Sequence, residues 1–323
     1  MNIKKIGMTA LAASLVSVSA HAGALSVSGS ASINTEGYSG ENLNGGTTFS
    51  MGNAITFSGS GELDNGMTVS VSYELDEGSN DGTTGHNVWD NHSVTVSSDS
   101  MGTLVFSGHG GSSAASSVGN AGGDIWDTFD GARGAVTAIA QSTAGAGNNS
   151  FFYTLPSVMD GASIFASYRP QGASGLGGAT GIGATYTGVD GLSITAAMTD
   201  IEGASSADSG DQTVWKASYA FGPITVAAGR SEYDVGTANS DETTSSMSLS
   251  YTVSDEMSVT YATNTLDSAN SSETDAEYSA LTASYTAGGM TISASMKEGD
   301  NTDHSTNTNA DFEYWSLGAS FAF

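Results

Sequence analysis

Three aspartates stand three residues apart near the middle of the chain: Asp124, Asp127 and Asp130. This spacing fits a segment that rests its apolar residues on another surface and turns its carboxylates toward water, where they attract cations. It fits equally well a solvated helical turn whose carboxylates serve only solubility. Arg133 follows three residues later, and we expect it to pair locally with Asp130. The apolar residues between the aspartates are Ile125, Trp126 and Phe129.

The remaining reactive residue types do not indicate enzyme chemistry. The histidines beyond the first 22 residues are His86, His92, His109 and His304, and none stands at metal-ligand spacing from another. The acidic stretch 299–303 lacks the spacing of a calcium-binding loop. The sequence has no cysteine, no G-x-S-x-G nucleophile elbow and no phosphate-binding P-loop. We therefore expect no enzyme activity, metal or cofactor, although a hydrolase with a triad drawn from distant strands would leave no such motif.

The charge balance excludes one class of partner. Only 7 lysines and arginines oppose 34 aspartates and glutamates, which gives a formal net charge of −27. Nucleic acids are bound through phosphates that need lysine and arginine, so we expect no nucleic-acid partner. Docking onto an anionic lipid surface is disfavoured for the same reason. High negative charge with abundant Ser, Thr, Gly and Asn is also typical of disorder, which the regular pattern described below rejects.

The first 22 residues have the pattern of a cleaved signal peptide. Lys4 and Lys5 precede a mostly apolar stretch, 6–18, and Ala20-His21-Ala22 gives the small-x-small site before Gly23. The apolar stretch is shorter than the ~20 residues that a membrane-spanning helix needs. No other apolar run approaches ~18 residues, which excludes a bundle of membrane helices. We expect residues 1–22 to be removed and residues 23–323 to form one exported domain.

Two-residue periodicity runs through this domain and predicts β-strands. In residues 67–76 the odd positions are Met, Val, Val, Tyr and Leu, while the even positions are Thr, Ser, Ser, Glu and Asp. Only a strand sorts such sets onto two faces. The pattern predicts strands near 25–33, 53–63, 67–76, 90–98, 103–109, 149–155, 162–169, 179–187, 191–199, 212–221, 224–233, 244–253, 257–265, 276–287, 289–297 and 313–323.

The connections between these strands alternate between short and long. Residues 64–66, 222–223 and 288–289 are short turns, whereas 34–52 and 200–211 are long and polar. Short turns at one rim and long loops at the other are typical of an outer-membrane barrel. Closure leaves no unpaired strand edge in lipid, and about sixteen strands enclose an aqueous interior. The sequence therefore predicts an all-β, 16-stranded antiparallel transmembrane β-barrel with apolar side chains toward lipid and polar ones toward the lumen.

The third long connection, about 110–148, is by far the longest, and here the chain resembles the general bacterial (Gram-negative) outer-membrane porins. The order of strands and loops carries the resemblance over the whole domain. Local matches support it: Gly102-Thr103-Leu104 and Gly108 resemble the segment before that family's constriction loop, and His109 replaces a basic residue that many relatives carry. The next hairpin resembles the family in Asn149-Ser150, Tyr153, Pro156, Gly161 and Tyr168.

The resemblance implies the fold's function and partners. It implies a third loop folded into the lumen, location in the bacterial outer membrane in contact with its lipid, and passive diffusion of small hydrophilic solutes and ions. It also implies a homotrimer. The C-terminal Phe323, with Phe321 and Ala319 in phase, resembles the signal read by the barrel-assembly machinery during biogenesis.

Strand phase predicts where the basic residues point. Arg169, Lys216 and Lys297 share the lumen phase, and opposite an acidic loop they would create a transverse field at a constriction formed by Asp124, Asp127, Asp130 and Arg133. The alternative is that they form rim salt bridges without a role in permeation. Arg230 falls in the outward phase unless a bulge shifts the register. The acidic excess predicts a preference for cations or neutral solutes.

Three other functions stay open at this stage. A substrate-selective channel would need a line of aromatic or ordered polar side chains along the lumen, whereas the inward phase is mostly Ser, Thr and Gly. A structural or adhesive barrel would have a closed lumen and conduct no ions. A secreted β-solenoid would need a fixed repeat, which the sequence lacks.

Overall fold

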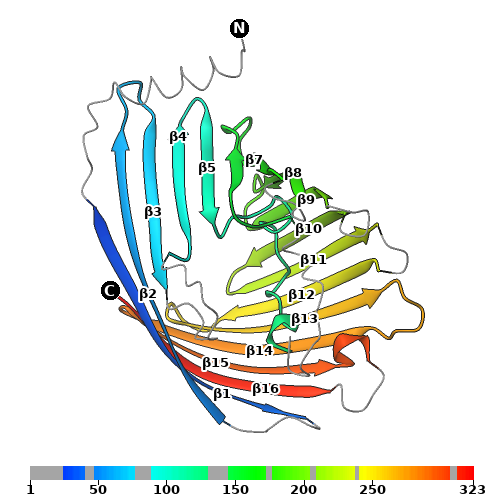
Figure 1. Cartoon of the computed structure of the whole chain (residues 1–323). Coiled ribbons are helices and arrows are strands. Elements are labelled where there is room, and N and C mark those ends of the chain that lie inside the picture. The colour runs from blue at the N-terminus through cyan, green and yellow to red at the C-terminus, as the bar shows by residue number, and fades with distance from the viewer. Residues whose placement is uncertain are drawn as a thin grey trace, which may run out of the picture.

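A computed structural model describes residues 25–40, 47–76, 89–129, 145–171, 177–203, 209–236, 240–305 and 311–323. Its strands close into a single antiparallel 16-stranded barrel in which β1 pairs with both β2 and β16 (Figure 1). The predicted fold class is confirmed, while the predicted boundary between residues 22 and 23 lies outside the described residues. The strands are β1 (Ser26–Ser39), β2 (Thr47–Glu62), β3 (Thr68–Asp76), β4 (His92–Ser98), β5 (Gly102–His109), β6 (Ser150–Thr154), β7 (Ala162–Arg169), β8 (Gly178–Tyr186), β9 (Leu192–Glu202), β10 (Gly210–Phe221), β11 (Ile224–Val235), β12 (Glu242–Thr252), β13 (Met257–Ser268), β14 (Ala276–Ala287), β15 (Met290–Asp300) and β16 (Phe312–Ala322).

Helical structure is minor in the described ranges. It consists of two single 3-10 turns, Trp126–Phe129 and Thr302–His304. No helix there has the length and apolar character needed to cross a membrane.

The apolar side chains of the two-residue pattern form the outer surface of the barrel. On β12, Met247, Leu249 and Tyr251 are 64%, 50% and 49% exposed, while Ser246 on the other face is buried. Neighbouring strands continue the same face through their register, so the exposed apolar side chains form a band around the barrel. The band includes the outward tyrosines Tyr73, Tyr186, Tyr219, Tyr251, Tyr261 and Tyr285.

Several strands are longer than the sequence pattern predicts. Residues 34–52 are expected to connect two strands, but β1 continues to Ser39 and β2 begins at Thr47, with Thr35 paired to Phe49. Likewise β9 extends to Glu202 and β10 begins at Gly210, inside the predicted connection 200–211. The physical reason is that apolar alternation ends where the lipid band ends. The backbone ladder needs no apolar side chains and continues into water.

The wall is uneven around its circumference. Strands β4, β5 and β6 contain 7, 8 and 5 residues, whereas β9 to β16 contain 11 or 12. A register shift between His92 and Ser93 further interrupts the β4–β5 pair. The paired wall is therefore lowest at β4–β6, next to the start of the third long connection.

Candidate functional site

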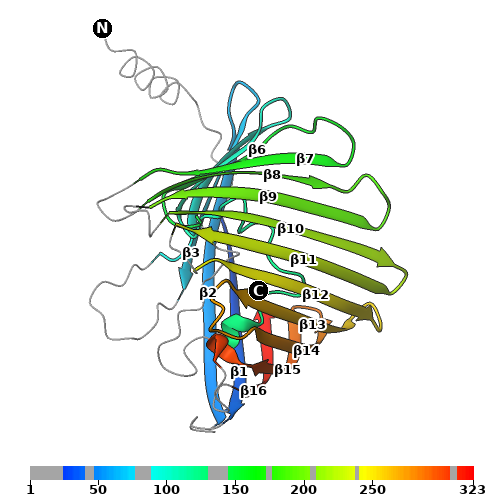
Figure 2. The same ribbon diagram turned by 90° about the vertical axis from the view of Figure 1, so that its right-hand side faces the viewer.

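The third long connection is described at residues 110–129 and 145–149, and Figures 1 and 2 both draw its first part within the ring of strands. Its backbone amides donate hydrogen bonds to side chains of β7 and β9. The Ala114 N–H donates to Ser167 Oγ on β7 at 2.8 Å, and the Ala115 N–H donates to Thr199 Oγ1 on β9 at 3.1 Å. Both hydroxyls belong to the polar, inward phase of their strands. Small polar side chains on the inner wall therefore serve as acceptors for the loop backbone.

The same arrangement continues on the later strands. The Ala121 N–H donates to Ser246 Oγ on β12 at 2.9 Å, and the Ile125 N–H donates to Asn264 Oδ1 on β13 at 2.8 Å. Beyond these strands, the Tyr38 hydroxyl on β1 donates to the Thr128 carbonyl at 3.1 Å. Residues 113–129, called here the third-loop segment, thus lie along the inner wall from β7 past β13 to β1.

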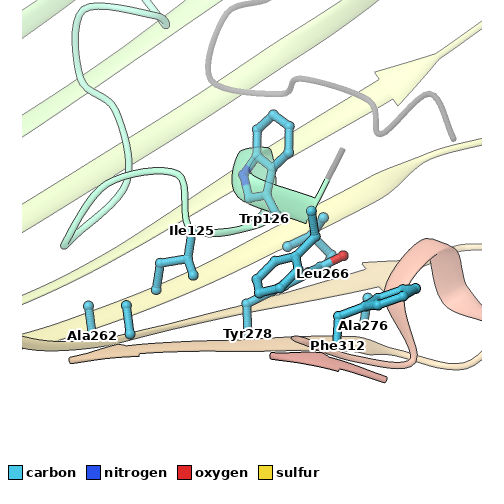
Figure 3. Packing of buried hydrophobic residues seen from close by; sticks show 9 residues of the cluster. Ile125, Trp126, Ala262, Leu266, Ala276, Tyr278 and Phe312 are labelled. Carbon is cyan, nitrogen blue, oxygen red and sulfur yellow. The ribbon is translucent and has the colours of Figure 1, made fainter. Parts of the chain in front are cut away.

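Apolar contacts hold the third-loop segment at two places. Its beginning packs Ala114, Ala115 and Val118 against Phe165, Ala197 and Val214 of the wall. Its end buries Trp126, which Figure 3 shows beside the wall residues Leu266 and Tyr278. Phe129 is also buried, and its ring centroid lies 5.7 Å from that of Tyr278. The second cluster consists of Ile125, Trp126, Phe129, Ala262, Leu266, Ala276, Tyr278, Ala280 and Phe312.

Sequence reasoning missed the wall side of these clusters. It expected inward faces of mostly Ser, Thr and Gly, yet Phe165, Val214, Leu266, Tyr278 and Phe312 occupy the inward phase and are buried. The sequence did contain a sign of this: apolar residues occupy positions where the two-residue alternation predicts polar ones. Such a residue is stable facing a wet lumen only when another part of the chain covers it.

The predicted acidic residues divide into described and undescribed ones. Asp127 is exposed, whereas Asp124 is half-buried and accepts a hydrogen bond of 2.7 Å from Asn120 Nδ2. Ile125, Trp126 and Phe129, interleaved with them, are buried against the wall. Asp130 and Arg133 lie outside the described residues. The structure thus places Asp124 and Asp127 at the edge of the second apolar cluster, and their role at a constriction stays a prediction.

The basic residues predicted for the lumen wall, Arg169, Lys216 and Lys297, lie in the inward phase next to the third loop. Lys297 donates from Nζ to Thr128 Oγ1 and stands 5.5 Å from the centroid of the Tyr314 ring. Lys216 Nζ lies 3.9 Å from the place that a Cβ on Gly119 would occupy. Arg169 donates to the carbonyl of Ala146 where the loop returns to the wall. These cations lie on the covered side of the wall. Lys216 and Lys297 lie on the same side of the lumen as Asp124 and Asp127, whereas Arg169 lies on β7, and a transverse field across a constriction stays a prediction.

Comparison with known proteins decides the family of this barrel. A family model described as Gram-negative porin matches residues 7–323. The chain belongs to the Gram-negative porin family. It is accordingly a channel protein of the bacterial outer membrane and not an enzyme. A search of curated protein sequences found no match.

Solved structures show the same fold. The anion-selective porin from Comamonas acidovorans is 15% identical, with a TM-score of 0.68 over 93% of this chain and 99% of that one. A porin refined at 1.8 Å resolution is 18% identical, with a TM-score of 0.67 over 93% and 100%. A loop L8 deletion mutant of OmpT, an outer membrane protein of Vibrio cholerae, is 15% identical, with a TM-score of 0.66 over 93% and 99%. At these identities the likeness shows the fold alone.

The uncovered wall of this porin carries a different set of polar groups. No residue of β2 to β5 is buried, so the third-loop segment does not cover their inner face. There, His109 Nδ1 lies 3.4 Å from Asp90 Oδ1, and Glu74 Oε2 accepts a hydrogen bond of 2.8 Å from Asn91 Nδ2. Glu74, Asn91 and His109 line a small polar pocket of about 130 Å³. In the described residues, no cluster of His, Asp and Glu has the arrangement of a metal site.

Arg230 is the exception among the basic residues of the porin. The β10–β11 register is continuous and places it opposite Trp215, so it faces outward without a bulge, as its strand phase predicts. Its Nε donates to Glu232 Oε1 at 2.7 Å, and both side chains are about half exposed.

Proposed function

We propose that this porin forms a water-filled passage for small hydrophilic solutes and ions, narrowed by its third loop and favouring cations. The observation that carries the proposal is the third-loop segment fastened to the inner wall of a closed barrel with Asp127 exposed. A loop seated in this way reduces the bore without closing it. Solutes then pass by diffusion, selected by width and charge.

The preference for cations over anions follows from which charged side chains of the lumen have an opposite charge nearby. Lys297 is held between the third loop and Tyr314, and Lys216 lies beside the loop near Asp124. The uncovered wall contributes Glu74 and Asp90, and its only groups in the described residues that can become positive are imidazoles. Negative charge therefore dominates the open part of the lumen. The fold does not fix this sign, since the Comamonas acidovorans porin of the same fold is anion-selective.

Reversal potentials in planar bilayers test this proposal. Across a potassium chloride gradient the wild type should prefer potassium, and replacing Asp124, Asp127 and Asp130 by Asn should bring the permeability ratio toward one. A matched control replaces Asp200, Asp211 and Asp234 by Asn, since these exposed carboxylates lie opposite one another on the outer face of β9, β10 and β11. A correctly folded barrel that conducts no ions would reject the channel, and a triple mutant with unchanged selectivity would reject the role of the loop.

We further propose that three copies assemble through the low wall at β4–β6. Strands of 7, 8 and 5 residues are shorter than the ~9–11 residues with which a tilted strand spans the bilayer. The outer face beside them is rich in aromatic rings: Phe106 lies 4.9 Å from Phe151, and Trp89 lies 5.6 Å from Tyr73. A second copy would shield this face from lipid, and the family resemblance implies three. Native mass spectrometry of the detergent-solubilised protein should give the trimer mass, and a monomer mass would contradict the proposal.

We infer that the chain is exported and inserted through signals at its two ends. Residues 1–22 would be cleaved, which mass spectrometry of the mature chain would show as a sequence beginning at Gly23. At the other end, Phe323 is 78% exposed while its backbone pairs with Gly29 of β1 at 2.8 and 3.0 Å. Its ring, like that of the partly exposed Phe321, is accessible to the barrel-assembly machinery. Phe323→Ala should lower the amount of barrel assembled in cells without changing the stability of the refolded protein.

A further inference from the structure

An apolar groove of about 550 Å³ lies on the outer face of β9 to β13. Its floor is formed by the small side chains Ala217 and Ala228, which pair across β10 and β11. Exposed Tyr219, Met247 and Leu249 rise around this floor. The long neighbours and short floor residues leave a depression within the apolar band.

Arg230 stands at one end of this groove. It follows Ala228 by two residues on β11, a distance of about 7 Å along a strand. Among the lysines and arginines of the described residues, Arg169, Lys216 and Lys297 have the inward phase, so Arg230 alone offers positive charge to the outside. Its Nε is used by Glu232, which leaves the two terminal amino groups of the guanidinium to reach another anion.

The depth of Arg230 fits a membrane interface. It lies opposite Trp215, an exposed aromatic residue of the kind enriched where lipid headgroups begin. It also lies on the side of the groove that faces the long connections, since β11 runs from the short turn at 222–223 toward residue 236. A charged side chain costs about 0–1 kcal/mol there but ~2–4 kcal/mol at the midplane. A lipid entering the groove from that leaflet would place its headgroup beside Arg230.

We propose that this groove binds one acyl chain of a membrane lipid while Arg230 holds the phosphate of the same lipid's headgroup. A guanidinium forms charge-assisted hydrogen bonds with a phosphate, and the terminal nitrogens of Arg230 keep this capacity although Glu232 pairs with its Nε and Asp211 and Asp234 lie farther along the same face. The groove itself is apolar, like an acyl chain. This site is separate from the lumen and does not depend on the proposed conduction. It makes the lipid a bound ligand of the barrel at β10–β12.

Native mass spectrometry of the detergent-solubilised trimer or monomer, titrated with dioleoyl phosphatidylglycerol, tests the site. The wild type should retain one lipid per chain. Ala228→Phe fills the groove and should abolish this retention. Arg230→Gln keeps the groove but loses the charge-assisted bond, which should weaken binding about tenfold. Ala294→Phe places the same bulk on an exposed outward alanine of β15, outside the groove, and should bind like the wild type.

Several outcomes would overturn the proposal. Retention by Ala228→Phe equal to that of the wild type would exclude the groove as the site. Unchanged affinity in Arg230→Gln would exclude recognition of the phosphate. A lower number of copies in Ala228→Phe would show that this face contacts a second chain and not a lipid. Folding of each variant is checked by its mobility shift on heating in detergent gels. If Ala228→Phe fails to fold, lipid retention by Ala217→Phe and Arg230→Gln tests the proposal instead.

Discussion

The inner faces of β7–β14 and of β2–β5 belong to the same barrel but follow different rules. On β7–β14 the inward positions include buried apolar residues such as Val214 and Tyr278, whereas no residue of β2–β5 is buried. The third-loop segment makes this difference, because it covers the first wall and leaves the second in contact with the lumen. Inward positions are therefore mainly polar on the uncovered wall and include buried apolar residues where the third-loop segment lies.

The largest effect is expected from the apolar contacts that hold the third-loop segment on the inner wall. Trp126→Ala removes a side chain that is 4% exposed, and such a truncation in a packed core costs about 3–5 kcal/mol. We expect the third-loop segment to detach, which raises single-channel conductance and hydrogen exchange in residues 113–129. Trp315→Ala serves as the control, since Trp315 faces outward and is 43% exposed. Equal conductance in both variants would mean that the covered wall does not position the loop.

A smaller effect is expected from one buried hydrogen bond. Asn264→Ala leaves the Ile125 N–H without its acceptor at 2.8 Å, which costs about 1–3 kcal/mol for a buried donor. Faster exchange of the Ile125 amide, measured by NMR or mass spectrometry, would report the loss. Asn270→Ala changes the same residue type in the connection after β13 and should leave that amide unchanged. If both variants behave alike, the polar inner wall does not hold the loop backbone.

Removing the cation under the loop should alter selectivity more than stability. Lys297→Met keeps the length of the side chain but ends the balance of charge with Asp127 and Glu36. We expect a stability loss of about 1 kcal/mol or less, because the pair is partly exposed, and a reversal potential shifted toward stronger cation preference. Thr128→Val removes the hydroxyl partner of Lys297 without changing charge, so it should not shift the potential. A shift toward anions in Lys297→Met would refute the assignment.

The smallest effect is expected on the uncovered wall. Ser70 faces the lumen from β3 and is half-buried, so Ser70→Val places a small apolar group in water without displacing a packed neighbour. The free energy of unfolding should change by no more than about 0.5 kcal/mol, as judged from guanidinium denaturation in micelles. A cost comparable with that of Trp126→Ala would erase the contrast between the two walls.

The sequence pattern predicted much of the barrel but less of its site. Alternation located every strand and the order of short and long connections, and strand phase predicted the inward Lys216 and the outward Arg230. The extents of β1 and β2 were wrong because apolar alternation marks the lipid band and not the end of hydrogen bonding. The inward Leu266 and Phe312 were overlooked because an apolar residue near a strand end has no meaning until its covering partner is known.

The sequence by itself determined which face of each strand meets lipid, because that face depends only on the side chains two residues apart along one strand. The tertiary structure decided which inward residues are covered. Ile125 meets Asn264, 139 positions away, and Thr128 meets Tyr38, 90 positions away, only after the strands have closed into a ring. Contacts at such separations depend on closure and curvature, which no local pattern encodes.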